Sequence, residues 1–195
     1  MSKNGTKKAV FQIVGTQSLI MHNVVNFMDP TNQTRKEFKG LTGKRTKTPE
    51  DEERIARLEW EMSLYLSQDG SLHIPPRVMQ SMMVSAAKLT KRGQSVKRGL
   101  RVDQAAPLTI PGWNKDDLNN NWESGKFSLA SVVVVTGKRI VRIRPQFQEW
   151  SAIAEFTYLP DVIDDRDISD IIDTGGRLVG LMDWRPYHGL FEVKS

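Results

Sequence analysis

The sequence contains no cysteine among its 195 residues, which excludes disulfides, thiolate nucleophiles and cysteine-based zinc sites. Histidine is scarce as well: His22, His73 and His188 lie far apart, with none of the short spacings that metal-binding histidines show. The sequence also lacks a P-loop and a Gly-x-Ser-x-Gly elbow. We therefore expect no metal ion, no cofactor and no enzymatic activity of these common kinds.

Long apolar runs are missing too. No stretch of about 18 apolar residues is present, so we expect neither a membrane span nor a membrane partner. The first residues, MSKNGTKKAVFQ, carry lysines but no apolar segment that would mark a signal peptide. The length suits one domain over residues 1–195. The expectation is a cytoplasmic protein.

Positive charge is in excess, and it is clustered. The net charge is +5, and basic residues concentrate in three runs, at 34–48, 88–101 and 138–144. Acidic residues gather elsewhere, at 49–61 and 161–173. A single run of this kind is often only solvated surface. Three runs in one small chain favour a polyanionic partner, of which nucleic acid is the common example.

The order of the expected elements indicates the fold class. Residues 1–8 form a loose tail, and alternating residues predict a first strand over 8–21. Residues 23–73 form a long basic insertion, irregular over 23–47 and containing a helix near 49–66 that Thr48, Pro49 and the acids after them initiate.

A second helix follows over 77–89, and the pattern is then that of strands, at 100–110, 127–135, 139–144 and 147–158. A helix beginning at 164–170 and a strand at 189–193 complete the chain. Without the insertion, this order predicts an α+β fold with a ferredoxin-like core, the split βαβ that RNA-recognition domains share. The insertion after the first strand would resemble a thumb. In RNA-recognition domains the open sheet face holds single strands.

Three groups of side chains have competing interpretations. Asp29, before Pro30 in the basic insertion, is a turn initiator or a weak candidate for assisting RNA cleavage. Arg142 and Arg144 share one side of a strand, where they pair with phosphates or protect a sheet edge. Trp184, between two charged residues, stacks on a base or packs in the core.

The chain ends with LVGLMDWRPYHGLFEVKS, which either closes a hairpin or forms a backbone loop shaped for a ligand. Here the sequence resembles the RAMP superfamily, the RNA-binding subunits of CRISPR effector complexes. Gly180, Arg185 and Gly189 resemble that family's glycine-rich loop, and HIPPRVMQSMMVSAAK resembles its proline-containing lead into the first core helix. The stretches MHNVVNFMDP, KRTKTPEDEERIARLEWEMSLYL, RIRPQFQEWSA and LMDWRPYHGLFEV also resemble a group of uncharacterised phage and prophage proteins.

The resemblance implies a phage-type protein in the host cytoplasm that coats single-stranded RNA or DNA as a homo-oligomer or filament. It leaves two alternatives: a metal-dependent endoribonuclease centred on Asp29, and a phage protein that mimics a CRISPR backbone subunit and blocks assembly with a host partner. The residues expected to contact nucleic acid are Lys44, Arg45, Lys47, Arg77, Lys88, Lys91, Arg92, Arg98, Arg142, Arg144, Trp184, Arg185 and His188.

Overall fold

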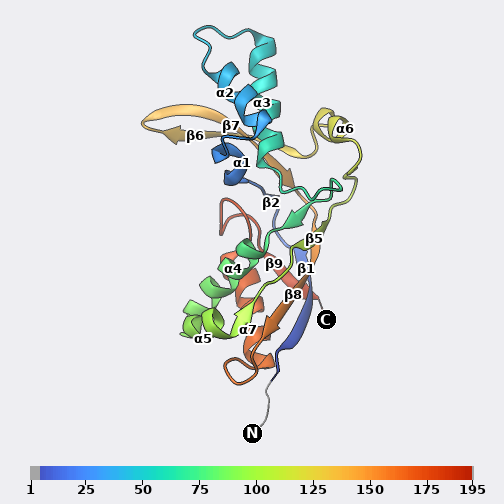
Figure 1. The fold of residues 1–195 in the computed structure, drawn as a ribbon, viewed down its shortest axis with the longest axis vertical. Helices are drawn as coiled ribbons and strands as arrows, with labels where there is room; N and C mark the ends of the chain where they lie inside the picture. Colours follow the sequence, from blue (N-terminus) through green and yellow to red (C-terminus); the bar gives the residue numbers. More distant parts are fainter. Residues whose placement is uncertain (1–4, 195) are drawn as a thin grey trace. The chain divides into compact units, whose positions relative to one another are not determined.

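The computed structural model of the chain describes residues 5–194, and it shows a mixed α+β protein with antiparallel sheets (Figure 1). The α+β class predicted from the sequence is therefore confirmed. The described residues divide into two compact units. Unit 1 comprises 5–19, 66–112 and 148–194, and unit 2 comprises 20–65 and 113–147. No helix in the described residues is both long and apolar enough to span a membrane.

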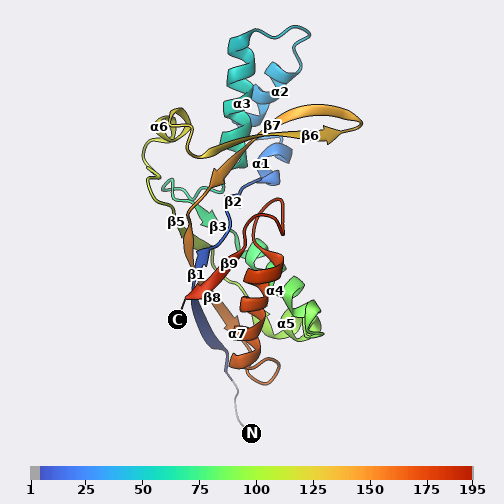
Figure 2. The same cartoon turned by 180° about the vertical axis from the view of Figure 1, so that it is seen from behind.

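Unit 1 is built on a sheet in which every pairing is antiparallel. Its strands lie in the order β3-β5-β8-β1-β9, with β4 also pairing with β8. Their bounds are β1 Lys7–Gly15, β3 His73–Ile74, β4 Leu100–Arg101, β5 Ala106–Thr109, β8 Ser151–Tyr158 and β9 Phe191–Lys194. The first strand therefore lies in the middle of the sheet, between the eighth and the last (Figure 2).

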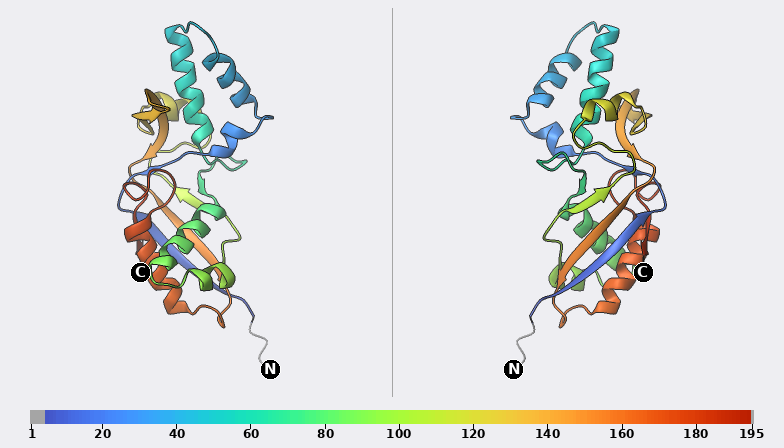
Figure 3. Two further views of the ribbon diagram at one scale, coloured as in Figure 1. Left: turned by 90° about the vertical axis from the view of Figure 1, so that its left-hand side faces the viewer. Right: turned by 90° about the vertical axis from the view of Figure 1, so that its right-hand side faces the viewer.

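The helices of unit 1 cover one face of this sheet (Figure 3). They are α4, Pro76–Leu89, the short α5, Gly93–Gly99, and α7, Asp165–Thr174, which continues into one π-helical turn, η1, Gly175–Val179. Asp164 begins α7 because its carboxylate accepts a hydrogen bond from the Asp167 N–H. The helices pack closely: a Cβ on Gly175 would lie 2.2 Å from the Met82 sulfur. Alternate residues of β8, from Ala152 to Tyr158, are buried.

Unit 2 combines helices with a three-stranded sheet of order β2-β7-β6. The strands are β2 Leu19–Ile20, β6 Ser128–Val135 and β7 Lys138–Phe147, and the helices are α1 Val24–Met28, α2 Gln33–Thr42, α3 Pro49–Ser63 and α6 Leu118–Glu123. Aromatic rings form its core: Trp60, fully buried, lies 6.1 Å from Trp113 and 5.5 Å from Trp122 between ring centroids. The Trp60 indole N–H also donates to the Phe127 carbonyl at 2.8 Å.

Several sequence-based expectations can now be assessed. The helix expected near 49–66 forms α3, where Thr48 and Asp51 make a reciprocal capping box. The expected irregular segment 23–47 is instead largely helical, since the Asn32 side chain caps α2 by accepting from the Arg35 N–H. Of the expected tail, residues 1–4 lie outside the described residues, and Lys7 and Lys8 already belong to β1.

Two expected strands are present but lie in a different sheet. Residues 128–135 and 138–147 pair with each other as the hairpin β6–β7, and the turn between them uses positive φ values of 48° at Thr136 and 80° at Gly137. The hairpin belongs to unit 2 and not to the sheet that contains β1. The strand expected over 100–110 is divided into the short β4 and β5.

Candidate nucleic-acid interface

The closing loop, residues 180–190, joins η1 to β9 and begins and ends with a close approach of backbone to backbone. The Leu181 N–H donates to the Gly189 carbonyl at 2.9 Å, and the Gly189 N–H donates to the Ser18 carbonyl at 2.8 Å. Gly180 and Gly189 both have φ of 76°, and a Cβ on Gly189 would lie 2.0 Å from the Leu181 oxygen. These two positions therefore require glycine.

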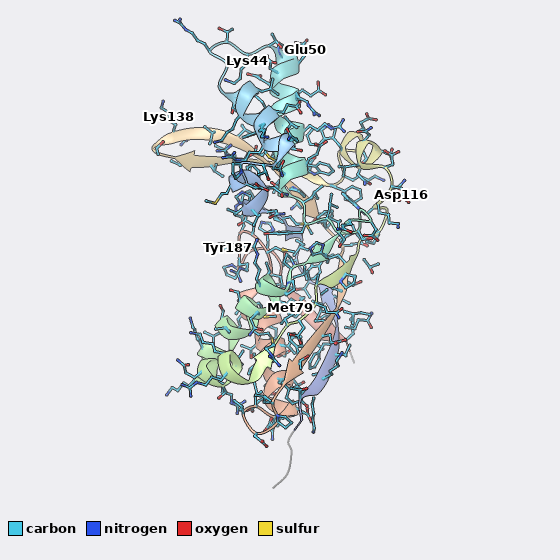
Figure 4. All side chains as sticks on the ribbon, viewed as in Figure 1. Lys44, Glu50, Met79, Asp116, Lys138 and Tyr187 are labelled. Carbon is cyan, nitrogen blue, oxygen red and sulfur yellow. The ribbon has the colours of Figure 1, made fainter. Side chains whose placement is uncertain are left out.

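Between these glycines the loop exposes large polar and aromatic side chains. Tyr187, labelled in Figure 4, is 83% exposed. Arg185 is exposed next to it. The His188 ring is held in place by a hydrogen bond, in which its Nδ1 lies 2.9 Å from the Ser18 hydroxyl. Trp184 stands 6.1 Å from the His188 ring and has φ of 55°, a conformation that costs a non-glycine residue about 1–3 kcal/mol.

A hollow of about 630 Å³ lies beside the loop, within unit 1. Its walls come from α4, from η1 and from the loop, and the lining residues are Ser85, Leu89, Leu178, Val179, Met182, Asp183, Trp184, Arg185 and Pro186. Leu89 and Leu178 are 59% and 58% exposed. The hollow therefore combines apolar side chains and a tryptophan, which suit a flat ring, with one arginine and one aspartate.

The carboxyl end of α4 adds cations beside this hollow. Lys88, in the last turn of α4, and Lys91, just after it, are exposed, and neither forms an ion pair within residues 5–194. Arg92 is partly buried and pairs with Asp167, so it is less available than predicted. Arg98 is exposed in α5, whereas Arg77 lies at the opposite end of α4, about 16 Å from Lys88 along the helix.

The predicted cations of the insertion lie in unit 2, in the turn between α2 and α3. Lys44 pairs with Asp51 at 2.6 Å, and the Lys47 ammonium donates to the Lys44 carbonyl at 3.0 Å. The Lys44 ammonium, with the Thr48 backbone N–H, lowers the pKa of the Asp51 carboxyl. Arg45 is exposed. Part of this basic run therefore serves the local structure of the turn.

The expectation of an exposed Arg144 is wrong. β7 is the central strand of its sheet, and Arg144 is 7% exposed, with its Nη1 donating to Glu59 Oε1 at 2.9 Å. Arg142 donates to the same oxygen at 3.2 Å, and the Ile143 N–H donates to Glu59 Oε2 at 3.1 Å. Neither arginine protects a sheet edge. Glu59 on α3, itself 3% exposed, draws both arginines inward, because a buried carboxylate needs paired charges.

Asp29 forms a local turn. Its Oδ1 accepts from the Thr31 N–H at 2.8 Å and from the Thr31 hydroxyl at 2.7 Å. These two hydrogen bonds, with the hydroxyl one the larger, lower the pKa of the Asp29 carboxyl. The geometry favours the turn-initiator interpretation of this residue. No group of three histidine or acidic residues in the described residues could hold a metal ion.

The open face of the unit 1 sheet differs from the one that RNA-recognition domains use. On the side of β1 and β8 away from the helices, the described residues are Lys8, Val10, Gln12, Val14, Ser151, Ile153, Glu155 and Thr157, with no aromatic ring among them. Lys8 pairs with Glu155 across the strands. Base stacking on this face is therefore not supported, and the closing loop is the better candidate.

Comparisons with known proteins add no assignment: no protein-family model matches the chain, and no curated protein matches it. The interface is therefore defined by geometry alone. Most of the residues that line the hollow were not predicted, among them Leu89 and Leu178, and neither was Tyr187. Tyr187 could have been identified, because an aromatic residue between Pro186 and His188 in a predicted loop has no strand or helix face on which to be buried.

Proposed function

We propose that the chain binds single-stranded nucleic acid without strong sequence preference, through the closing loop and the carboxyl end of α4. The observation that carries this proposal is the hollow of about 630 Å³, with Trp184 and Arg185 in its wall. Lys88 and Lys91 lie on the adjoining helix end, and the 83% exposed Tyr187 extends from the same loop. Cations that follow a backbone, with aromatic rings on which bases stack, are the usual elements of single-strand binding.

We further propose that unit 1 is a ferredoxin-like domain related to the RAMP superfamily. The support is its strand order, β5-β8-β1-β9, with antiparallel neighbours throughout and two helices, α4 and α7, as the crossovers. In chain order this is strand, helix, two strands, helix, strand, the split βαβ arrangement. The closing loop then precedes the last strand, where the family resemblance places the glycine-rich loop.

In this proposal several copies coat one strand. Each copy contributes a small, sequence-independent contact, and a longer strand takes up proportionally more copies. Electrostatic attraction to phosphates supplies most of the affinity, so binding weakens as salt displaces the lysines and arginines from the backbone. The turn between α2 and α3, which carries Arg45, is a secondary candidate for phosphate contact.

The test is fluorescence-anisotropy titration of labelled single-stranded RNA, single-stranded DNA and duplex at about 50 and about 200 mM salt. Single strands should bind more tightly than duplex, and affinity should fall steeply with salt. The variant Lys88→Gln/Arg185→Gln should weaken binding of every sequence. It should also reduce the salt slope by roughly 1.4, because each cation that neutralises a phosphate of a single strand accounts for about 0.7 of that slope.

Lys8→Gln is the matched control, since Lys8 is exposed but pairs with Glu155 on the sheet face. It should leave the salt slope unchanged. Tyr187→Ala should weaken binding without changing the slope, because a stacking ring releases no counterions. Absence of binding to all three nucleic acids would overturn the proposal and direct the search to a protein partner, such as a host CRISPR-type subunit.

A further inference from the structure

The outer edge of β6 is the least protected strand edge in the described residues. β6, Ser128–Val135, pairs with β7 on one side and has no strand on the other. It is eight residues long, contains no charged residue and no proline, and its register with β7 runs without a bulge. Proteins usually protect an edge strand by keeping it short or by placing a charged residue, a proline or a bulge in it, because its unpaired N–H and C=O groups can bind other strands.

One face of the β6–β7 hairpin exposes valine side chains next to this edge. Val132 and Val134 of β6 are 62% and 68% exposed, and Val141, opposite Val132 on β7, is 61% exposed. Figure 4 shows Lys138 at the hairpin tip, at the far end from the part of β7 that meets α3. An uncharged edge bordered by exposed valines is a surface for a further strand.

We propose that the occupant is β6 of a second copy of this chain, paired antiparallel across a twofold axis. This inference is independent of the nucleic-acid proposal. Length is the first argument: with Ser131 placed opposite Ser131 of the copy, seven of the eight residues of β6, Ser128 to Val134, face the same segment of the other copy. The other edge strands of the two sheets are shorter, since β9 has four residues and β2 and β3 have two each, and pairing with any of them would leave much of β6 unpaired.

Charge is the second argument. β6 contains no charged side chain, so self-pairing brings no like charges together. The two exposed cations of the hairpin, Lys138 and Arg139, lie at the tip, whereas Arg142 and Arg144 are paired with Glu59. An antiparallel pair places the two tips at opposite ends of the joined sheet, whereas a parallel pair would bring them together. A twofold antiparallel contact is also self-complementary and closed, so it gives a dimer and not a fibre.

The experiment is analytical ultracentrifugation of the full chain, without nucleic acid, from about 5 to 200 μM. The unaltered chain should form dimers. Val132→Lys should weaken dimerisation at least tenfold, because it places two like charges at diagonal positions of the paired strands, next to the twofold axis. Val141→Lys is the matched control: it is directly opposite, equally exposed and on the central strand, so dimerisation should persist.

The outcomes are decisive. A monomeric unaltered chain at all concentrations would overturn the proposal. Equal loss of dimer in both variants would assign the contact to the valine face and overturn edge pairing, as would a Val132→Lys chain that still dimerises. Because the chain has no cysteine, a second readout is available. Under a mild oxidant Ser131→Cys should form a disulfide-linked dimer, while Val141→Cys should remain a monomer on a non-reducing gel.

Discussion

The sheets of the two units differ in the strands that form their edges. In unit 1 the long strands β1 and β8 lie inside the sheet, and the edges are short or carry charges, as in β9 with Glu192 and Lys194. In unit 2 the long strand β6 is itself the edge, and it has no charge. The first sheet is complete within one chain, whereas the second is suited to accept another strand.

The two units also differ in how they are held together. Unit 1 has an apolar core, in which Gly175 lies close against Met82 and Ile172 is fully buried. Unit 2 attaches its hairpin to α3 through one buried carboxylate that binds two arginines. Apolar burial is non-directional and tolerates modest changes, but a buried ion cluster depends on every partner. Unit 2 should therefore be the more sensitive to single substitutions.

The largest expected effect tests this difference directly. Glu59→Gln removes the negative charge that Arg142 and Arg144 share, and should lower the free energy of unfolding by about 3–5 kcal/mol, the usual result of breaking a buried pair. Urea denaturation measures the loss, and hydrogen exchange should assign it to β6, β7 and α3. The control is Glu192→Gln, whose exposed pair with Lys194 contributes about 0–1 kcal/mol. Equal loss of protection in β1 and β8 would contradict the comparison.

A smaller effect compares two glycines, one in each unit. In Gly137→Ala the added methyl group meets open space, so the variant should lower the free energy of unfolding by about 1–2 kcal/mol, through the positive φ alone. Gly189→Ala has the same kind of φ but also places a methyl group 2.0 Å from the Leu181 oxygen. The loss in free energy of unfolding should therefore be larger than that of Gly137→Ala by on the order of 2 kcal/mol, since the backbone must move. Thermal unfolding of both variants checks the order, and equal losses would show that the closing loop adapts freely.

The smallest effect concerns acid. Burial of the His73 imidazole in β3 lowers its pKa, with a smaller opposing effect from the Ser71 backbone. The unfolded chain then binds a proton more readily than the folded one. This contribution to stability is complete above the ordinary pKa of about 6.5 and decreases as pH falls toward the folded value. His73→Gln should therefore flatten the stability of unit 1 between pH 7.5 and pH 5, measured by urea denaturation. An unchanged pH profile would contradict the assignment.

Local elements of this fold could be predicted from the sequence, but their partners could not. Thr48, Pro49 and the acids that follow define the start of α3 through local hydrogen bonds. Residues 128–147 join their sheet through contacts with residues far away in the chain. The alternation of residues within a strand does not indicate which partners it pairs with. The hairpin turn at Thr136 and Gly137 was the available signal that β6 and β7 pair with each other.

The surroundings of the predicted site residues also depend on contacts distant in sequence. Alternating arginines on a strand are typical of a solvent face, and Arg144 is buried because Glu59 approaches from a helix 85 positions away in sequence. Glu59 itself was informative, since it lies between Leu58 and Trp60 on a helix with a buried face. The place of the closing loop, between the last helix and the last strand, could be predicted because its glycines, Trp184 and Arg185 are close together in sequence.

The division of the chain into interleaved segments has a consequence for its synthesis. β1 precedes both of its sheet neighbours, β8 and β9, by most of the length of the chain, so it is synthesised well before them. The nine residues of β1 therefore stay unpaired in the nascent chain until β8 has been synthesised. Such long-range pairing slows folding. Chaperones that cover an unpaired strand should therefore raise the yield of folded chain.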